Sequence, residues 1–231
     1  MILKDIYERF AKKTPVSVMV RATIENVLSA DRLDAIFEEN AQQQYSGDLL
    51  FSTVAGIMGS VVCQIHPSVN AAYVDREKEI GVTIKSVYDK LKGIERDVSR
   101  GLVCDTAARM QAIIKQTGEL SEPVVTGYRI KIVDGNHLRR TDRRIAELRE
   151  LNAAPLPGHA LVVFDPQYRL VVDVLPCEDG HAQERTLLPE LLKTTESKDL
   201  WIADRNFCTI GFLFGIASRR GKFIIRQHGN L

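Results

Sequence analysis

The chain has 231 residues, of which 45% are hydrophobic and 26% are charged, a normal balance for a globular protein that buries a core. The 31 basic and 30 acidic residues give a formal net charge of +1, which excludes an overall positive field that would attract nucleic acid. Any contact with an anionic partner must therefore come from local clusters of basic residues.

The cysteines and the hydropathy pattern restrict the class of protein further. The four cysteines are widely separated and include no CxxC pair, which fits a reducing compartment and fits neither a zinc knuckle nor a disulfide scaffold. The first ten residues lack the apolar segment of a signal peptide, and no later stretch approaches 18 uninterrupted apolar residues. We therefore expect a soluble, cytoplasmic protein without a membrane partner.

The first half of the sequence is predicted to be helical. From residue 5 to about residue 118, apolar residues recur at spacings of three and four, which predicts four to six helices. Within this region, residues 49–65 are apolar nearly all round and predict a buried central helix. The pattern changes at residues 119–123, where a turn-rich stretch introduces short β-branched and aromatic runs. We therefore predict a helical domain over residues 1–120 and a second domain over residues 121–231.

Two of the predicted helices resemble a helix-turn-helix. Residues 71–79 and 83–92 are joined by a short segment around Gly81, and the second helix would expose Lys85 and Lys92. Similar pairs of helices are common in helical domains, so a purely structural role stays open. If the pair binds DNA, Lys85 and Lys92 are the candidate contacts.

The second half is predicted to follow the order β, β, β, α, β, α, β. Strands are expected at residues 128–133, 159–164, 170–175, 200–203 and 222–226, and helices at 183–192 and 209–218. Residues 165–168 read as a type I turn with Pro166 at its second position, so the second and third strands should form a hairpin. The fold class is therefore α/β, with the helical domain followed by a domain built on a mixed β-sheet.

Two aspartates stand at the ends of predicted strands. Asp134 follows the first strand and precedes Gly135, and Asp204 follows the fourth strand. Side chains at the carboxyl ends of neighbouring parallel strands meet at one crevice, where ligands usually bind. Two carboxylates brought together repel unless a proton or a hard cation lies between them, and Mg²⁺ binds carboxylates together with phosphate oxygens. The pattern predicts a metal site for phosphodiester chemistry; the alternative is that each aspartate only caps a turn or the next helix.

The residues around both aspartates resemble a known family. The stretches IVDGNHL at residues 132–138 and WIADRNFC at residues 201–208 resemble the two first acidic motifs of bacterial insertion-sequence transposases of the DDE type. Residues 158–165 and 178–188 also resemble this family, so the resemblance covers roughly residues 124–231 closely. It implies a ribonuclease H-like catalytic domain, whose opening order of elements agrees with the order predicted above from the residues alone.

The resemblance implies that Asp134 and Asp204 are catalytic metal ligands, with Mg²⁺ or Mn²⁺ as the cofactor. It also implies a third ligand, a glutamate within a Tyr, Arg, Glu, Lys signature, and no residue of this sequence matches it. Glu178, Asp179 and Glu184 precede Asp204 and therefore fall in the wrong chain order. We expect an incomplete ribonuclease H-like domain, in a chain truncated before the third acidic residue, that does not cleave DNA alone.

The implied function is DNA transposition, in which phosphodiester cleavage and strand transfer take place at the ends of a mobile element. The implied partner is double-stranded DNA, both the terminal inverted repeats and the target, in a bacterial nucleoid; a homodimer is possible. The alternative function is a truncated regulator of transposition, which binds element ends or dimerises with the intact enzyme into inactive mixed complexes.

A basic cluster follows the first aspartate. Its neighbours include acidic residues at helical spacing, so part of it is predicted to be an exposed helix over residues 141–151. The cluster also lies next to the predicted metal crevice, where a phosphate backbone must run. The candidate DNA-binding residues are Arg139, Arg140, Arg143 and Arg144. The histidines have no metal-ligand spacing among themselves and are expected to be ordinary surface or core residues.

Overall fold

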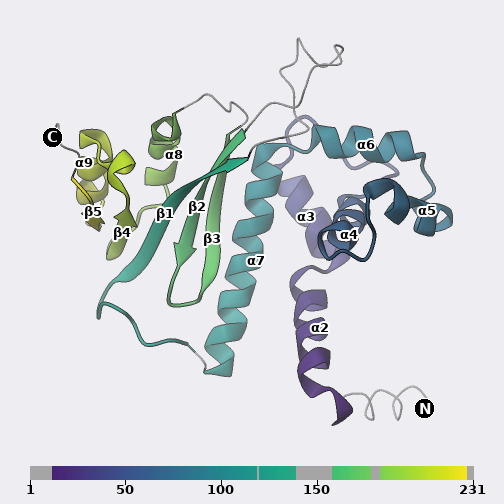
Figure 1. The fold of residues 1–231 in the computed structure, drawn as a ribbon, viewed down its shortest axis with the longest axis horizontal. Helices are drawn as coiled ribbons and strands as arrows, with labels where there is room; N and C mark the ends of the chain where they lie inside the picture. Colours follow the sequence, from purple (N-terminus) through teal and green to yellow (C-terminus); the bar gives the residue numbers. More distant parts are fainter. Residues whose placement is uncertain (1–11, 119, 139–157, 178–182, 228–231) are drawn as a thin grey trace. The chain divides into compact units, whose positions relative to one another are not determined.

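The structure is a computed structural model that describes residues 12–118, 120–138, 158–177 and 183–227 (Figure 1). The chain divides into two compact units, Met1–Gly93 and Ile94–Leu231. The predicted helix over residues 141–151 and the arginines Arg139, Arg140, Arg143 and Arg144 lie outside the described residues.

The first unit is helical, as predicted. Its helix α4 (Phe51–Val62) packs against α3 (Ala30–Asn40), α5 (Val69–Ile80) and α6 (Ile84–Gly93). The rings of Phe37 in α3 and Phe51 in α4 stack with centroids 5.4 Å apart. The buried central helix predicted over residues 49–65 is present as α4, but α4 is shorter than predicted and is only partly buried, since Val62 is 75% exposed. The described helices are α2 (Pro15–Val27), α3 (Ala30–Asn40), α4 (Phe51–Val62), α5 (Val69–Ile80) and α6 (Ile84–Gly93).

The second unit begins with the helix α7 (Arg96–Thr117) and continues in the predicted order of strands and helices. The predicted boundary at residues 120 and 121 placed α7 with the helical domain, whereas in the structure α7 packs on the strand β3 (Leu170–Cys177) within the second unit. The elements after α7 are β1 (Arg129–Leu138), β2 (Gly158–Asp165), β3 (Leu170–Cys177), η2 (Glu184–Leu187), α8 (Leu188–Leu192), β4 (Asp199–Ala203), η3 (Arg205–Phe207), α9 (Ile210–Ser218) and β5 (Lys222–Ile225).

The strands form one mixed five-stranded sheet in the order β3-β2-β1-β4-β5. The pairs β1–β2 and β2–β3 are antiparallel, and the pairs β1–β4 and β4–β5 are parallel. The predicted hairpin of β2 and β3 is present, and its turn begins at Asp165, whose Oδ1 accepts hydrogen bonds from the backbone N–H groups of Gln167 and Tyr168. The α/β class and the mixed sheet are therefore confirmed.

Charged side chains attach α7 to the sheet. The guanidinium of Arg100 in α7 donates from Nε and Nη2 to the two carboxylate oxygens of Asp173 in β3, both at 2.8 Å, and from Nη1 to Glu190 in α8 at 2.6 Å. Hydrogen bonding to Asp173 raises the pKa of Arg100 further. The thiol of Cys104 also donates to Asp173, and burial raises the pKa of Cys104 to about 12.

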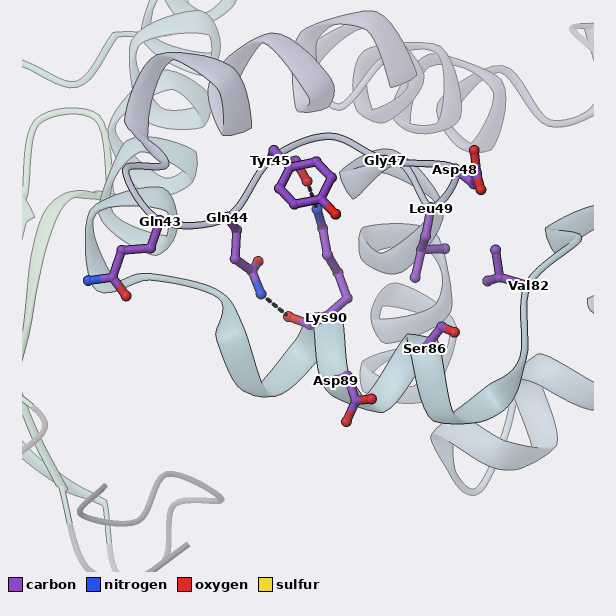
Figure 2. Close-up of a pocket in the computed structure, with 10 residues that line it drawn as sticks. All are labelled: Gln43, Gln44, Tyr45, Gly47, Asp48, Leu49, Val82, Ser86, Asp89 and Lys90. Atoms are coloured by element: carbon purple, nitrogen blue, oxygen red, sulfur yellow. Dashed lines mark hydrogen bonds between the residues drawn. The ribbon is translucent and has the colours of Figure 1, made fainter. Parts of the chain in front are cut away.

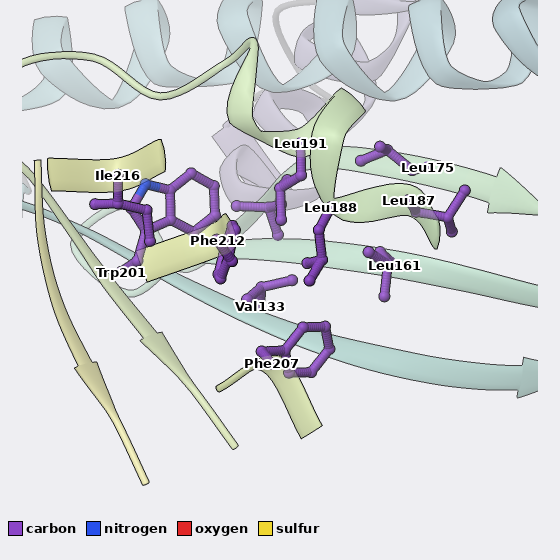
Figure 3. Close-up of a cluster of buried hydrophobic side chains, with 11 residues drawn as sticks. Val133, Leu161, Leu175, Leu187, Leu188, Leu191, Trp201, Phe207, Phe212 and Ile216 are labelled. Carbon is purple, nitrogen blue, oxygen red and sulfur yellow. The ribbon is translucent and has the colours of Figure 1, made fainter. Parts of the chain in front are cut away.

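One face of the sheet carries the hydrophobic core of the second unit (Figure 3). The Trp201 ring of β4 is fully buried and meets Phe212 of α9 edge-on, with centroids 6.2 Å apart. Helices α8 and α9 cover this face because each is apolar on the side that meets the strands. The buried members of the core are Val133, Leu161, Val163, Leu175, Leu187, Leu188, Leu191, Trp201, Phe207, Phe212 and Ile216.

Candidate metal site at the ends of two parallel strands

Asp134 lies within β1 and not after it. The strand was predicted to end at Val133, but β1 continues to Leu138 because its antiparallel pairing with β2 extends as far as the pair Leu138 and Gly158. The parallel pairing of β1 with β4 stops earlier, at Ile132 and Ile202. Asp134 therefore stands where β1 loses its parallel neighbour, and its side chain is exposed.

Asp204 occupies the corresponding place on β4. The last parallel pair joins Ile132 to Ile202, and each aspartate stands two residues beyond its member of that pair. The backbone of Asp204 is extended, with φ −77° and ψ 179°, so the strand alternation continues through it. Side chains alternate between the two faces of a sheet, so Asp134 lies on the same face as Ile132, and Asp204 on the same face as Ile202. Val133 and Trp201 lie on the opposite face. The two aspartates therefore stand at matching register positions of neighbouring parallel strands.

Each carboxylate is oriented by one backbone N–H group. Oδ1 of Asp134 accepts a hydrogen bond from Gly135 at 2.9 Å, and Oδ1 of Asp204 accepts one from Asn206 at 2.8 Å and thereby caps η3. The capping role that the sequence left as an alternative for Asp204 is thus real. Neither bond uses Oδ2, which leaves an oxygen of each exposed carboxylate for a hard cation such as Mg²⁺.

No group of three or more histidine, cysteine, aspartate or glutamate side chains among the described residues is close enough to hold one metal ion. The two carboxylates therefore fit a site that shares its cation with further oxygen ligands, such as water or the phosphate oxygens of a substrate.

Residues of η2 lie beside both motifs, which the sequence did not predict. Glu184 contacts Gly135 so closely that a methyl group at position 135 would overlap its carboxylate. Next to it, Arg185 donates from Nε to the backbone oxygen of Asn206 at 2.8 Å. The local sequence carries no signal for these contacts, because η2 is about fifty residues from Gly135 and is brought there by the packing of Leu187 and α8 on the sheet.

The predicted DNA-binding residues of the first unit lie on α6. Helices α5 and α6 are joined at Gly81, which has a left-handed backbone with φ 69°, so the two helices and the glycine turn were correctly predicted. Lys85 and Lys92 are exposed on α6, and Val87 is fully buried beneath them. Whether these lysines contact DNA stays a prediction, because the same arrangement serves ordinary packing of α6 on α4.

The first unit also contains an open hollow of about 460 Å³ (Figure 2). Lys90 crosses it, donates from Nζ to the backbone oxygen of Tyr45 at 2.8 Å, and lies 4.0 Å from the centroid of the Phe37 ring. Burial lowers the pKa of Lys90. These contacts attach the segment before α4 to α6, and none of the predicted site residues lines the hollow. We assign it a structural role.

Residues 126–231, which include both aspartates, match the family model of the transposase DDE domain. A comparison with curated proteins gives no match.

Among solved structures, the chain is similar to the piggyBac transposase in a synaptic complex with hairpin DNA. The sequence identity is 14% and the TM-score is 0.38, and the similarity covers 89% of this chain and 49% of the transposase chain. The chain therefore spans about half the length of that protein. Among the described residues, no helix is long and apolar enough to span a membrane.

Proposed function

We propose that this chain is part of a DNA transposase and that Asp134 and Asp204 bind the divalent cations, Mg²⁺ or Mn²⁺, required for cleavage and joining of phosphodiester bonds. The observation that carries the proposal is that a family match to the transposase DDE domain contains two aspartates at the same register beyond neighbouring parallel strands. The partner on this proposal is double-stranded DNA, as element ends and as target.

The cations would activate the attacking hydroxyl and stabilise the leaving oxygen of the phosphodiester. The contribution of the chain is to hold and orient the two carboxylates. The backbone N–H groups of Gly135 and Asn206 each hold one oxygen of a carboxylate, so its orientation is fixed before a cation arrives. Arg205 and Arg185 are exposed on the adjoining 3₁₀ helices, where a phosphate backbone would find positive charge.

A finer proposal concerns the number of carboxylates. The resemblance implies a third carboxylate, and no residue of the sequence matches its signature. With two of three ligands, cations are bound more weakly and one of them is misplaced. We therefore expect the 231-residue chain on its own to bind Mn²⁺ measurably and to leave DNA uncut.

The alternative function is regulation of transposition by a chain that binds element ends or dimerises with the complete enzyme. The observation that favours it is the pair α5 and α6 with its glycine turn and two exposed lysines. Lys85→Ala and Lys92→Ala should each weaken DNA binding and reduce its dependence on salt concentration, while Lys193→Ala in the other unit should change neither. Equal binding by all three variants would contradict this role for α6.

The experiment that tests the metal site is equilibrium binding of Mn²⁺ to the chain. Asp134→Asn and Asp204→Asn should each weaken binding by about tenfold or more, since each removes a charged ligand. Asp89→Asn, at an exposed aspartate of α6, is the matched control and should bind as the parent does. Unchanged Mn²⁺ affinity in both site variants would refute the assignment. In a complete enzyme, full nicking activity of either variant would refute it as well.

A further inference from the structure

Two histidines lie side by side at the far end of the β1–β2 ladder. His137 of β1 is directly opposite His159 of β2, and the two Nδ1 atoms are 3.4 Å apart. The ring centroids are 5.0 Å apart and the planes are inclined by 54°, so the rings do not stack face to face. His137 is exposed and His159 is partly buried, which leaves the pair accessible from solvent.

The separation of the two nitrogen atoms matches that of two ligands on one metal ion. Zinc binds histidine nitrogen at about 2.0 to 2.1 Å with tetrahedral angles, which places two such nitrogens about 3.3 to 3.4 Å apart. A direct N–H···N hydrogen bond at 3.4 Å would in contrast be longer than the range of about 2.7 to 3.2 Å in which protein N–H hydrogen bonds are strong. The distance is that of a long hydrogen bond between the rings, and it also fits two nitrogen ligands on one cation.

The pair is separate from the two aspartates. Asp134 and His137 are three residues apart on β1, and alternation along a strand places them on opposite faces of the sheet. The histidines share their face with Cys177, which is directly opposite His159 on β3, and with Glu184, whose carboxylate lies over Gly135. This face thus carries nitrogen and sulfur ligands, which suit zinc and its neighbours, whereas the aspartates offer only oxygen.

We propose that His137 and His159 bind a late first-row divalent cation such as Zn²⁺ through their Nδ1 atoms. No set of three potential ligands among the described residues converges on one point, so the two imidazoles are the ligands proposed here. Cys177 is the nearest thiol in register and is not in a disulfide. The ion would crosslink the ends of β1 and β2, three residues from Asp134.

The test is a titration of the full chain with Zn²⁺ in the presence of excess Mg²⁺, which occupies sites made only of oxygen ligands. His137→Ala and His159→Ala should each weaken Zn²⁺ binding by about tenfold or more, because one imidazole alone is a weak site. His137→Gln and His159→Gln repeat the test with side chains closer in size. His66→Ala, at a histidine of the first unit, and Asp134→Asn are the controls and should retain the parent affinity.

The proposal is overturned if all four histidine variants, folded by circular dichroism, bind Zn²⁺ as tightly as the parent chain. It is also overturned if Asp134→Asn removes Zn²⁺ binding while the histidine variants keep it, because the ion would then belong to the aspartate site. The result that supports the proposal is that Zn²⁺ shifts the ring NMR signals of His137 and His159 together, while Mn²⁺ binding to the aspartates persists in the histidine variants.

Discussion

Replacing Arg100 by methionine should destabilise the second unit by removing the only basic partner that the structure gives Asp173 in the described residues. Arg100→Met retains the length and apolar stem of the side chain and removes the guanidinium. The side chain of Asp173 is only 9% exposed. After the substitution, the donors that remain to its carboxylate are the weak thiol of Cys104 and the backbone N–H of Val174. The helix α7 loses its main polar attachment to β3.

The expected loss of stability in Arg100→Met depends on how deeply Arg100 and Asp173 are buried. Removing one partner of a fully buried ion pair costs about 3 to 5 kcal/mol, mainly because the remaining charge stays buried without compensation. The side chain of Arg100 is 21% exposed, so water partly compensates the loss. We therefore expect a decrease of about 2 to 3 kcal/mol in the free energy of unfolding. Arg100→Met combined with Asp173→Leu should recover most of it, because no buried charge then remains.

The assay is urea denaturation followed by the fluorescence of Trp201, the single tryptophan of the chain, which is buried in the core of the second unit. Arg96→Met on the same helix is the control, since the side chain of Arg96 is 51% exposed and its loss should change stability by less than about 0.5 kcal/mol. The reasoning is refuted if Arg100→Met is as stable as the parent, or if the double variant is less stable than Arg100→Met alone.

Three further predictions follow from single contacts. Cys104 should resist alkylation at pH 8, because its pKa of about 12 leaves almost no thiolate, whereas the exposed Cys63 should react. Mass spectrometry of peptides from the alkylated native protein measures both, and faster alkylation of Cys104 than of Cys63 would contradict the prediction. Gly135→Ala should lower the free energy of unfolding by about 1 kcal/mol, because the new methyl group displaces the Glu184 carboxylate. The double variant with Glu184→Ala should recover this loss, and a loss that persists would place the clash elsewhere. Phe212→Ala should cost about 3 to 5 kcal/mol by thermal or urea denaturation, and a loss below about 1 kcal/mol would mean that the core collapses around the gap.

Local signals were sufficient to predict most of the second unit. Pro166 at the second turn position identified the hairpin of β2 and β3, and the short apolar strand β4 ends one residue before Asp204, as expected. The helix α9 begins after Thr209, whose hydroxyl caps it by accepting a hydrogen bond from the N–H group of Phe212. These elements were predictable because strand alternation, turn residues and caps act over a few residues.

Features that depend on contacts between distant residues were not predictable. The end of β1 was placed at Val133, because only the pairing with β2 extends the strand to Leu138. The proximity of His137 and His159 has the same origin, since it depends on the register of that pairing. The position of α7 depends on Arg100, which meets Asp173 across 73 residues of sequence. The roles of the two aspartates and of the exposed lysines stay predictions.

The register of β1 and β4 bears on how such sites diverge between relatives. The aspartates stand at matching places because Ile132 pairs with Ile202. Insertions or deletions in the connections between β1 and β4 would change the spacing in sequence and leave the carboxylates aligned. Distant members of the family are therefore better recognised by an apolar strand leading into each aspartate than by a fixed interval between them.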